Sequence, residues 1–237
     1  MILYVNGDSH AAAAEAVNPH GWACDDSRFF YLGQAPHPDN LAVSWSRRLA
    51  DALKLGLINH AQSGGSNDRI VRTLQDYFSQ PGINPRNHFV IIQWSTWERT
   101  EWLIDDQWYQ INGSGMDAVP KSHQQQYRDF VNNVDWIACT KHWHDRIWEV
   151  HQQLIDLDIP HVFFNGNSHF GALPENERFD WGKNYIAPYD PKSTYDQWLR
   201  SHGFDTVAPN SWHFGKDAHS AWSRFVLQYI VENKMIA

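Results

Sequence analysis

Short apolar runs alternate with longer segments in which apolar residues recur at helical spacing, and this alternation constrains the fold more than any other feature. The runs have the length and composition of buried strands; they are Ile2–Val5, Leu57–Asn59, Phe89–Trp94 and His161–Phe164. The segments with helical periodicity are Leu41–Leu55, Asn67–Phe78, Gln124–Ile137, Cys139–Leu157 and Asp217–Glu232, with a break expected near Asp135. Such alternation predicts a parallel sheet covered on both sides by helices and built from right-handed crossovers.

The chain is long enough for one α/β domain with a full hydrophobic core. It has 237 residues, and no repeat, low-complexity segment or linker divides it, so we expect a single domain over residues 1–237. Two loop-rich segments interrupt the pattern, at about 98–123 and 166–195. Each follows directly after a predicted strand, at the edge where open α/β sheets bind ligands. We therefore expect these insertions to shape a substrate site.

Composition and charge argue against several classes of protein. The formal net charge is −8 and Lys and Arg form no cluster, so a nucleic-acid partner is not expected. Cys24 and Cys139 provide neither a disulfide framework nor zinc spacing and fit a reducing compartment. Met1 leads straight into a strand rather than a signal peptide, and no apolar run approaches the roughly 18 residues of a membrane span. We expect a cytoplasmic protein without a membrane partner; the sequence leaves the oligomeric state open.

A serine lies on a turn directly after the first predicted strand, within residues 6–10 (NGDSH). At the carboxyl end of a strand the hydroxyl of Ser9 would be exposed. The small residues Ala11–Ala14 predict a following helix, whose terminal N–H groups can stabilise an oxyanion. Ser9 is therefore a candidate nucleophile, although serine is also a good helix N-cap and the turn alone does not decide between the two roles.

A candidate base lies near the other end of the chain. His213 is in a loop just before the last helical segment, and in a doubly wound sheet that loop reaches the same edge as the end of the first strand. Asn210 stands three residues earlier, close enough to hold the imidazole by its Nδ1. After the second strand, Gly64 and Gly65 allow close approach of a substrate to the backbone. Asn67 is either a further donor or a helix cap.

These blocks resemble the SGNH/GDSL hydrolase family. They are Gly7-Asp8-Ser9 after the first strand, Gly64 in a Ser-Gly-Gly-Ser turn after the second, and residues 210–213 (NSWH) before the last helix. The resemblance implies a flavodoxin-like, three-layer α/β/α fold and ester hydrolysis through an acyl-serine intermediate, with no cofactor. It implies Ser9 as nucleophile and His213 as general base. The backbone N–H groups of Ser9 and Gly64 would form part of the oxyanion hole.

Two positions depart from the pattern of that family. The family has Asp three residues before the His, where this chain has Asn210; an amide can fix the imidazole tautomer but does not stabilise imidazolium by charge. The family's Asn after the third strand is replaced by Trp97, a less suitably placed donor, so Asn67 or Thr96 would have to supply the missing hydrogen bond. Loss of one such donor typically lowers turnover by ~10²–10³-fold, which predicts a slow enzyme.

Tryptophan is unusually frequent, with 13 residues, many of them beside polar residues. Amphipathic rings suit a ligand cleft and flat aromatic faces suit sugar rings, although half-buried helix positions also explain some of them. Glu98 and Arg99 follow the third strand and either bind a substrate or pair with each other. The candidate substrate-binding residues at the strand ends are Asp8, His10, Trp94, Thr96, Trp97 and Arg99.

We therefore expect a serine esterase that acts on a small-molecule or glycan ester, such as an O-acylated carbohydrate. The alternative is a catalytically weak or inactive protein of the same fold that binds glycans or a protein partner, which the departures at Asn210 and Trp97 motivate. A metal-dependent phosphoesterase is a weaker possibility. His144 and His151 are two helical turns apart, too far for one ion, so we expect no metal site and a solvated helix face there.

Overall fold

Four parallel strands form the central sheet of the protein in a computed structural model, which describes residues 1–21, 36–113 and 115–236. The strands are β1 (Ile2–Asn6), β2 (Gly56–Asn59), β3 (His88–Trp94) and β6 (His161–Asn165), in the order β2-β1-β3-β6. This is the strand order of a flavodoxin-like sheet, with the first strand at an inner position. Neighbouring strands pair in parallel throughout. The predicted α/β fold with a parallel, flavodoxin-like sheet is therefore confirmed.

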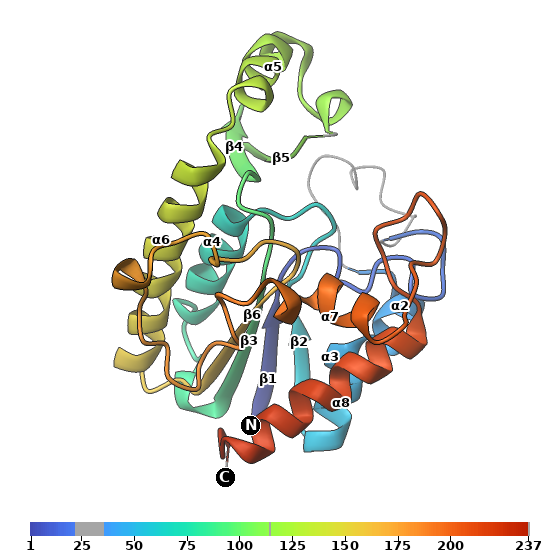
Figure 1. Cartoon of the computed structure of the whole chain (residues 1–237), viewed down its shortest axis with the longest axis vertical. Coiled ribbons are helices and arrows are strands. Elements are labelled where there is room, and N and C mark those ends of the chain that lie inside the picture. Colours follow the sequence, from blue (N-terminus) through green and yellow to red (C-terminus); the bar gives the residue numbers. More distant parts are fainter. Residues whose placement is uncertain (22–35, 114, 237) are drawn as a thin grey trace.

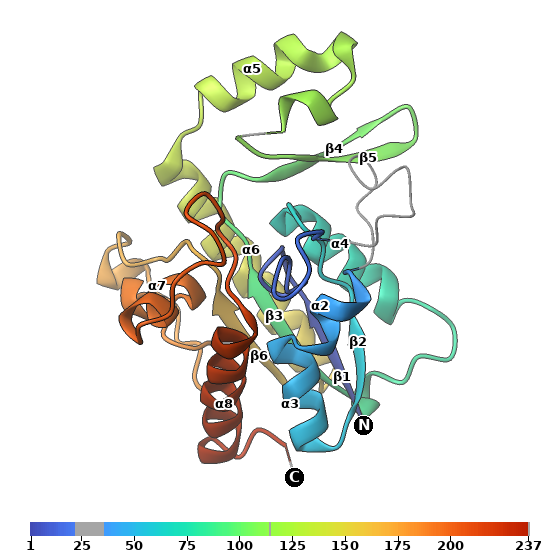
Figure 2. The ribbon, with the colours of Figure 1, turned by 90° about the vertical axis from the view of Figure 1, so that its right-hand side faces the viewer.

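Alternate residues of each strand face two different helical layers, which makes the molecule a three-layer sandwich (Figures 1 and 2). In β3, Phe89 and Ile91 belong to one buried cluster, whereas Val90 and Ile92 belong to the other. The first cluster packs against α3 (Trp45–Leu53) and α8 (Lys216–Glu232), and the second against α4 (Asn67–Phe78) and α6 (Trp136–Asp156). None of the helices in the described ranges is long and apolar enough to cross a bilayer.

Capping side chains set where the helices begin. The break predicted near Asp135 is the N-cap of α6, where the carboxylate accepts two backbone N–H groups of the first turn, after the end of α5 (Gln124–Asn132). Ser44 caps α3 in the same way by accepting the N–H of Arg47 at 3.0 Å. The segment expected to be helical over residues 41–55 is consequently divided into α2 (Pro38–Ala42) and α3.

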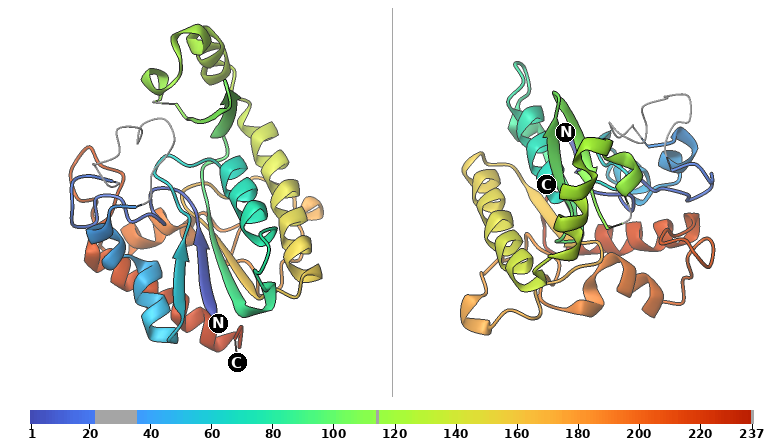
Figure 3. Two further views of the ribbon diagram at one scale, coloured as in Figure 1. Left: turned by 180° about the vertical axis from the view of Figure 1, so that it is seen from behind. Right: turned by 90° about the horizontal axis from the view of Figure 1, so that it is seen from above.

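The first insertion forms an antiparallel hairpin that the sequence pattern does not reveal. β4 (Thr100–Ile104) and β5 (Gln107–Ile111) are joined by Asp105 and Asp106, which both have positive φ. The hairpin and α5 lie beyond the carboxyl ends of the sheet strands (Figures 1 and 3). This insertion is therefore placed at the edge of the sheet where Ser9 lies.

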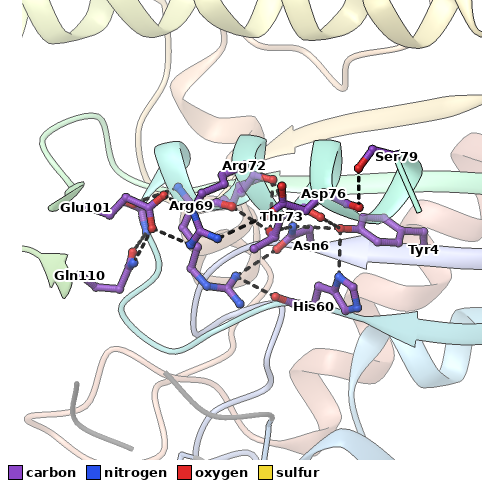
Figure 4. Close-up of polar contacts among 12 residues, drawn as sticks. Tyr4, Asn6, His60, Arg69, Arg72, Thr73, Asp76, Ser79, Glu101 and Gln110 are labelled. Atoms are coloured by element: carbon purple, nitrogen blue, oxygen red, sulfur yellow. Dashed lines mark hydrogen bonds and ion pairs between the residues drawn. The ribbon is translucent and has the colours of Figure 1, made fainter. Parts of the chain in front are cut away.

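Polar contacts fasten the hairpin to α4 (Figure 4). Arg72 donates to both carboxylate oxygens of the buried Glu101 on β4, at 2.7 and 2.9 Å. Gln110 on β5 donates to the same carboxylate at 3.0 Å, and its amide oxygen accepts the N–H of Ser66, the N-cap of α4, at 2.9 Å. The hairpin is thus held directly against the turn that follows β2.

The second insertion, residues 166–195, covers the outer edge of β6. The carbonyl of Asn184 accepts the N–H of Phe163 at 2.7 Å, and the N–H of Ile186 donates to the carbonyl of Phe163 at 2.9 Å. Phe170 and Trp181 of the same segment are buried in the cluster that includes α6. This insertion therefore supplies hydrogen-bond partners to the backbone at the outer edge of β6 and adds apolar side chains to the core before α7 (Tyr195–Ser201) begins.

The histidine-containing face of α6 is buried, so the expectation of a solvated face is wrong for His144 and His151. Both lie on the same side of the helix as Ile147 and Leu154, which pack into the core. His151 Nδ1 lies 2.8 Å from Nε2 of the buried His161. In the described part of the chain, no three His, Cys, Asp or Glu side chains gather as metal ligands.

Acid should destabilise the fold through His161. Burial lowers the pKa of this side chain from 6.5 to about 4. The unfolded state therefore binds more protons between these values, and the free energy of unfolding should fall as the pH decreases through that window. A shift of this size corresponds to about 3 kcal/mol. Urea denaturation at about pH 7 and about pH 4.5 should show a flatter pH dependence for His161→Gln than for wild type. The exposed control His142→Gln should keep the wild-type slope; an unchanged slope for His161→Gln would contradict this account.

Candidate active site

Ser9 follows β1 in a turn that is packed against the end of β3. A Cβ atom on Gly7 would lie 2.7 Å from the Cβ of Ala11, so the start of the turn requires glycine. Gln93, near the end of β3, accepts the N–H of Ala11 at 3.1 Å and ties the turn to the neighbouring strand. Ser9 is thereby positioned at the carboxyl edge of the sheet.

The alanine-rich segment after Ser9 is not the helix that the sequence predicts. Ala13 and Glu15 have positive φ angles of 54° and 61°, and the N–H of Ala14 bonds back to the carbonyl of Ser9 at 2.9 Å. The alanines are almost completely buried, so tertiary packing overrides their helix propensity. In the described residues 8–21 no helix N-terminus faces Ser9; the turn instead brings Glu15 back beside the loop that contains His213.

The carboxylate of Glu15 holds His213. Its Oε2 lies 2.7 Å from His213 Nδ1 and accepts a hydrogen bond from Ser211 Oγ at 2.6 Å. Burial opposes ionisation of Glu15, but the hydrogen bonds from Ser211 and His213 outweigh it and lower the pKa of the carboxyl. Asn210, which the sequence predicts in this position, is instead exposed, and its side chain makes no hydrogen bond within the described ranges. Glu15 and His213 are 198 residues apart, and the only sequence signal for Glu15 is that it is the first carboxylate after Ser9.

The loop of His213 adjoins the turn of Ser9. Its backbone is fixed by a hydrogen bond from the N–H of Val207 to the carbonyl of His213 at 2.9 Å. The rings of His10 and His213 meet edge to face with centroids 5.9 Å apart. Ser9 Oγ and His213 Nε2 are hydrogen-bonded neither to each other nor to other residues that the structure describes. Ser9 is only 7% exposed, so the exposed hydroxyl expected at this strand end is not found.

Asp8 is 1% exposed and fully hydrogen-bonded beside Ser9. Its Oδ2 accepts Ser95 Oγ at 3.0 Å and Arg99 Nη1 at 3.2 Å, and its Oδ1 accepts the N–H of His10 at 3.0 Å. Burial opposes ionisation of Asp8, but His10, Arg99 and these hydrogen bonds outweigh it and lower the pKa of the carboxyl. The buried Asp8 and the 20% exposed Arg99 thus form an ion pair at the site; their contacts with a substrate stay a prediction.

His10 is buried between the Ser9 turn and Tyr195, with ring centroids 5.0 Å apart. Burial lowers the pKa of His10, and the attraction of Asp8 offsets this only in part. Behind it, the buried His219 accepts the N–H of Trp45 through Nδ1 at 3.3 Å. The neutral form is therefore favoured for both His10 and His219, the two imidazoles near His213.

Gly64 lies in the turn after β2 with φ +74°, a conformation that favours glycine. This turn is joined to the Ser9 turn because the N–H of Gln62 donates to the carbonyl of Gly7 at 3.1 Å. Within the described residues, no partner accepts a hydrogen bond from the backbone N–H of Ser9 or of Gly64. Two backbone donors are therefore unused at the carboxyl edge of the sheet.

The side chains of Asn67 and Thr96, which the sequence analysis considers as further donors, are already engaged. Asn67 Nδ2 donates to the carbonyl of Ser95 at 3.2 Å and its Oδ1 accepts the N–H of Ser95 at 2.8 Å, so this amide joins α4 to the end of β3. Thr96 Oγ1 donates to Glu98 at 3.0 Å. Glu98 and Arg99 therefore do not pair with each other.

Trp94 and Trp97 are core residues, so their predicted contact with substrate is wrong. Trp94 is fully buried against Phe163, with ring centroids 5.2 Å apart. Trp97 stacks on Phe170 at 4.6 Å, and its indole N–H points to the carbonyl of His169 at 3.5 Å. The large apolar area of an indole favours burial over exposure at a strand end.

A surface pocket of about 350 Å³ adjoins His213. Its lining residues are Glu15, Ala208, Asn210, Ser211, Trp212 and His213. Trp212, one of these lining residues, is 73% exposed. An imidazole held by a carboxylate therefore lines an open surface pocket.

Removal of the Arg99 charge should destabilise the protein strongly. Arg99→Met leaves the buried Asp8 without its cation, which should cost about 3–5 kcal/mol in the free energy of unfolding. The matched control is Arg86→Met, because Arg86 pairs with Asp158 at 3.4 Å but both side chains are exposed. Its effect should be below about 1 kcal/mol. Urea denaturation compares the two variants; similar losses in both would contradict a structural role for the buried pair.

Comparison with known proteins identifies a family and two distant structural likenesses. The profile of DUF6071, a family of unknown function, matches residues 37–162, which is more than half of the chain. No curated protein matches the sequence. The psychrotrophic esterase EstA from Pseudoalteromonas sp. is 13% identical with a TM-score of 0.42, over 98% of this chain and 97% of EstA. The acetyl xylan esterase Est2A from the rumen bacterium Butyrivibrio proteoclasticus is 10% identical with a TM-score of 0.42, over 99% of this chain, which spans 64% of Est2A. The protein belongs to the DUF6071 family.

Proposed function

We propose that this protein is a serine ester hydrolase of the SGNH type in which Ser9 is the nucleophile, His213 the general base and Glu15 the carboxylate that orients His213. The observation that carries the proposal is the 2.7 Å contact between Glu15 Oε2 and His213 Nδ1, at the edge of the sheet where Ser9 lies. A carboxylate on Nδ1 fixes the tautomer whose Nε2 accepts a proton and stabilises the imidazolium that forms. Glu15 thus supplies the charge that Asn210 lacks.

The reaction proceeds in two steps. Ser9 Oγ bonds to the ester carbonyl carbon while its proton passes to His213 Nε2, and the carbonyl π electron pair moves to the oxygen. The tetrahedral intermediate collapses to an acyl-serine, and the leaving alkoxide takes the proton from His213. Water then attacks the acyl carbon with His213 again as base, which releases the acid and restores Ser9.

The unused N–H groups of Ser9 and Gly64 are the donors for the oxyanion. Backbone donors held in fixed turns need no reorganisation when the negative charge develops, which is the physical basis of this kind of stabilisation. Because the side chains of Asn67, Thr96 and Trp97 are engaged elsewhere, these two backbone groups carry the oxyanion in this proposal. We therefore expect turnover below that of a site with three donors, by ~10²–10³-fold.

The second candidate function is a binding protein of the same fold without efficient catalysis. It is favoured by one observation, that Ser9 Oγ and His213 Nε2 do not form a hydrogen bond in the described structure. Catalytic contacts of this kind are often long without ligand and tighten with bound substrate, so the observation is compatible with both functions. Activity measurements separate them.

Ser9 should be required for covalent labelling and for turnover. Wild type should react with a fluorophosphonate probe and hydrolyse p-nitrophenyl acetate, whereas Ser9→Ala should lose both because it lacks the nucleophilic oxygen. Ser122→Ala, which changes an exposed serine, serves as the control and should behave as wild type. Labelling or turnover that survives Ser9→Ala would refute the nucleophile, and glycan binding without any turnover would favour the binding protein.

The activity of His213 as general base should depend on Glu15 rather than on Asn210. Glu15→Gln keeps the shape but removes the charge on Nδ1, so kcat on p-nitrophenyl acetate should fall by on the order of 10³–10⁴-fold. Asn210→Ala should change kcat on this small ester by less than about 3-fold, because a peripheral side chain contributes little to transition-state binding. The two variants should unfold at similar temperatures. A larger loss for Asn210→Ala than for Glu15→Gln would reverse the assignment.

A further inference from the structure

We infer that the pocket beside His213 is a saccharide subsite, in which a sugar ring stacks on Trp212 and the amide of Asn210 binds its hydroxyl groups. This inference rests on the proposed function and specifies the alcohol half of the ester. The pocket has a volume of about 350 Å³. Neither Asn210 nor Trp212 has another role in the site among the described residues.

Trp212 is one of the tryptophans whose polar neighbours predict a ligand cleft, and it differs from several of the others in its exposure. Trp94, Trp97 and Trp143 are buried in the core, whereas Trp212 is 73% exposed and is adjacent in sequence to the proposed base. An indole presents a flat apolar face that matches the C–H face of a pyranose ring.

The loop holds Trp212 in place before a ligand arrives. Ser211 on one side donates to Glu15 at 2.6 Å and accepts the N–H of His213 at 2.9 Å. His213 on the other side is fixed by Glu15 and by the backbone hydrogen bond from Val207. An aromatic platform between two anchored residues loses little conformational entropy on binding, which favours affinity.

The polar rim of the pocket indicates an uncharged, hydroxyl-rich ligand. The exposed amide of Asn210 offers both donors and acceptors, and Glu15 Oε1 makes no hydrogen bond within the described residues, so it can accept one from a hydroxyl. A long acyl chain would require an enclosed apolar pocket, whereas this pocket is open and, among the described lining residues, Ala208 and Trp212 are the apolar ones. Glu15 and the net charge of −8 disfavour a phosphorylated ligand.

The position of the pocket assigns it to the alcohol half of the substrate. His213 delivers its proton to the leaving oxygen when the tetrahedral intermediate collapses, so the alcohol leaves on the side of the imidazole. Asn210 and Trp212 lie on the same loop as that imidazole. The sugar is therefore the alcohol, and the substrate class is a carbohydrate that is O-acylated on a hydroxyl group.

The test compares two esters in the same variants. Trp212→Ala should lower kcat/KM on a mono-O-acetylated methyl glucoside by about 10-fold or more, mainly through KM, because an aromatic anchor dominates binding energy. On p-nitrophenyl acetate the same variant should stay within about 2-fold, because this ester lacks the sugar. Trp212→Phe should keep most of the activity. Asn210→Ala should lose about 2- to 10-fold on the sugar ester alone.

The control is Trp136→Ala, which removes a tryptophan that is 56% exposed at the start of α6 and should affect neither ester. Equal losses of Trp212→Ala on both esters would show that Trp212 only supports the loop, and no loss on either would show that it contacts no substrate; both results overturn the inference.

A binding measurement separates failure of the inference from failure of the proposed function. Unacetylated methyl glucoside, titrated against wild type and Trp212→Ala by isothermal titration calorimetry, needs no catalysis and no tryptophan as reporter. If wild type hydrolyses neither ester, the proposed function fails, but binding that disappears in Trp212→Ala still supports the subsite. Absence of binding to wild type, or binding that Trp212→Ala leaves unchanged, refutes the subsite whatever the activity.

Discussion

The ion pair of the buried Asp8 with the partly exposed Arg99 is the interaction on which the candidate site depends. Asp8 belongs to the turn after β1, while Arg99 and Ser95 belong to the segment after β3, so the pair joins the ends of two neighbouring strands. Asn67 extends the connection to α4 by bonding the backbone of Ser95 in both directions. A carboxylate that is removed from water in this way is stable only while its partners stay in place, which makes the strand ends one cooperative unit.

The segment after Ser9 forms a turn with a strained backbone where the sequence predicts a helix. This difference has a chemical consequence. Ala13 and Glu15 adopt left-handed conformations that cost of order 1–3 kcal/mol each. Burial of Ala11–Ala14 and the two hydrogen bonds of Glu15 offset that cost. In return, the proposed nucleophile and the carboxylate that orients the proposed base lie on one short segment. The His213 loop then needs to supply only the imidazole, which leaves Asn210 and Trp212 free to contact a ligand.

The regular elements were predictable from the sequence because their periodicity is strong, and the site was predictable only in part. The four strands agree with the structure to within one or two residues, and the predicted helix over residues 67–78 coincides with α4. The hairpin β4–β5 was not foreseen because its short strands lack a regular alternation of apolar and polar residues. Trp94 shares its face with Val90 and Ile92, so strict use of the strand period places it in the core. Glu15 could not be assigned, since its contact depends on backbone angles that alanine-rich sequence disfavours.

His213 has a carboxylate in direct contact and, on another side, an imidazole whose neutral form burial favours. Glu15 contacts His213 directly, and the charge of Asp8 is largely compensated by Arg99. His10 lies 5.9 Å away, measured between ring centroids, and a charge on it would oppose imidazolium formation at His213. Burial lowers the pKa of His10 and so removes that opposition at neutral pH. The same burial that anchors the Ser9 turn therefore makes Glu15 the dominant electrostatic influence on the proposed base.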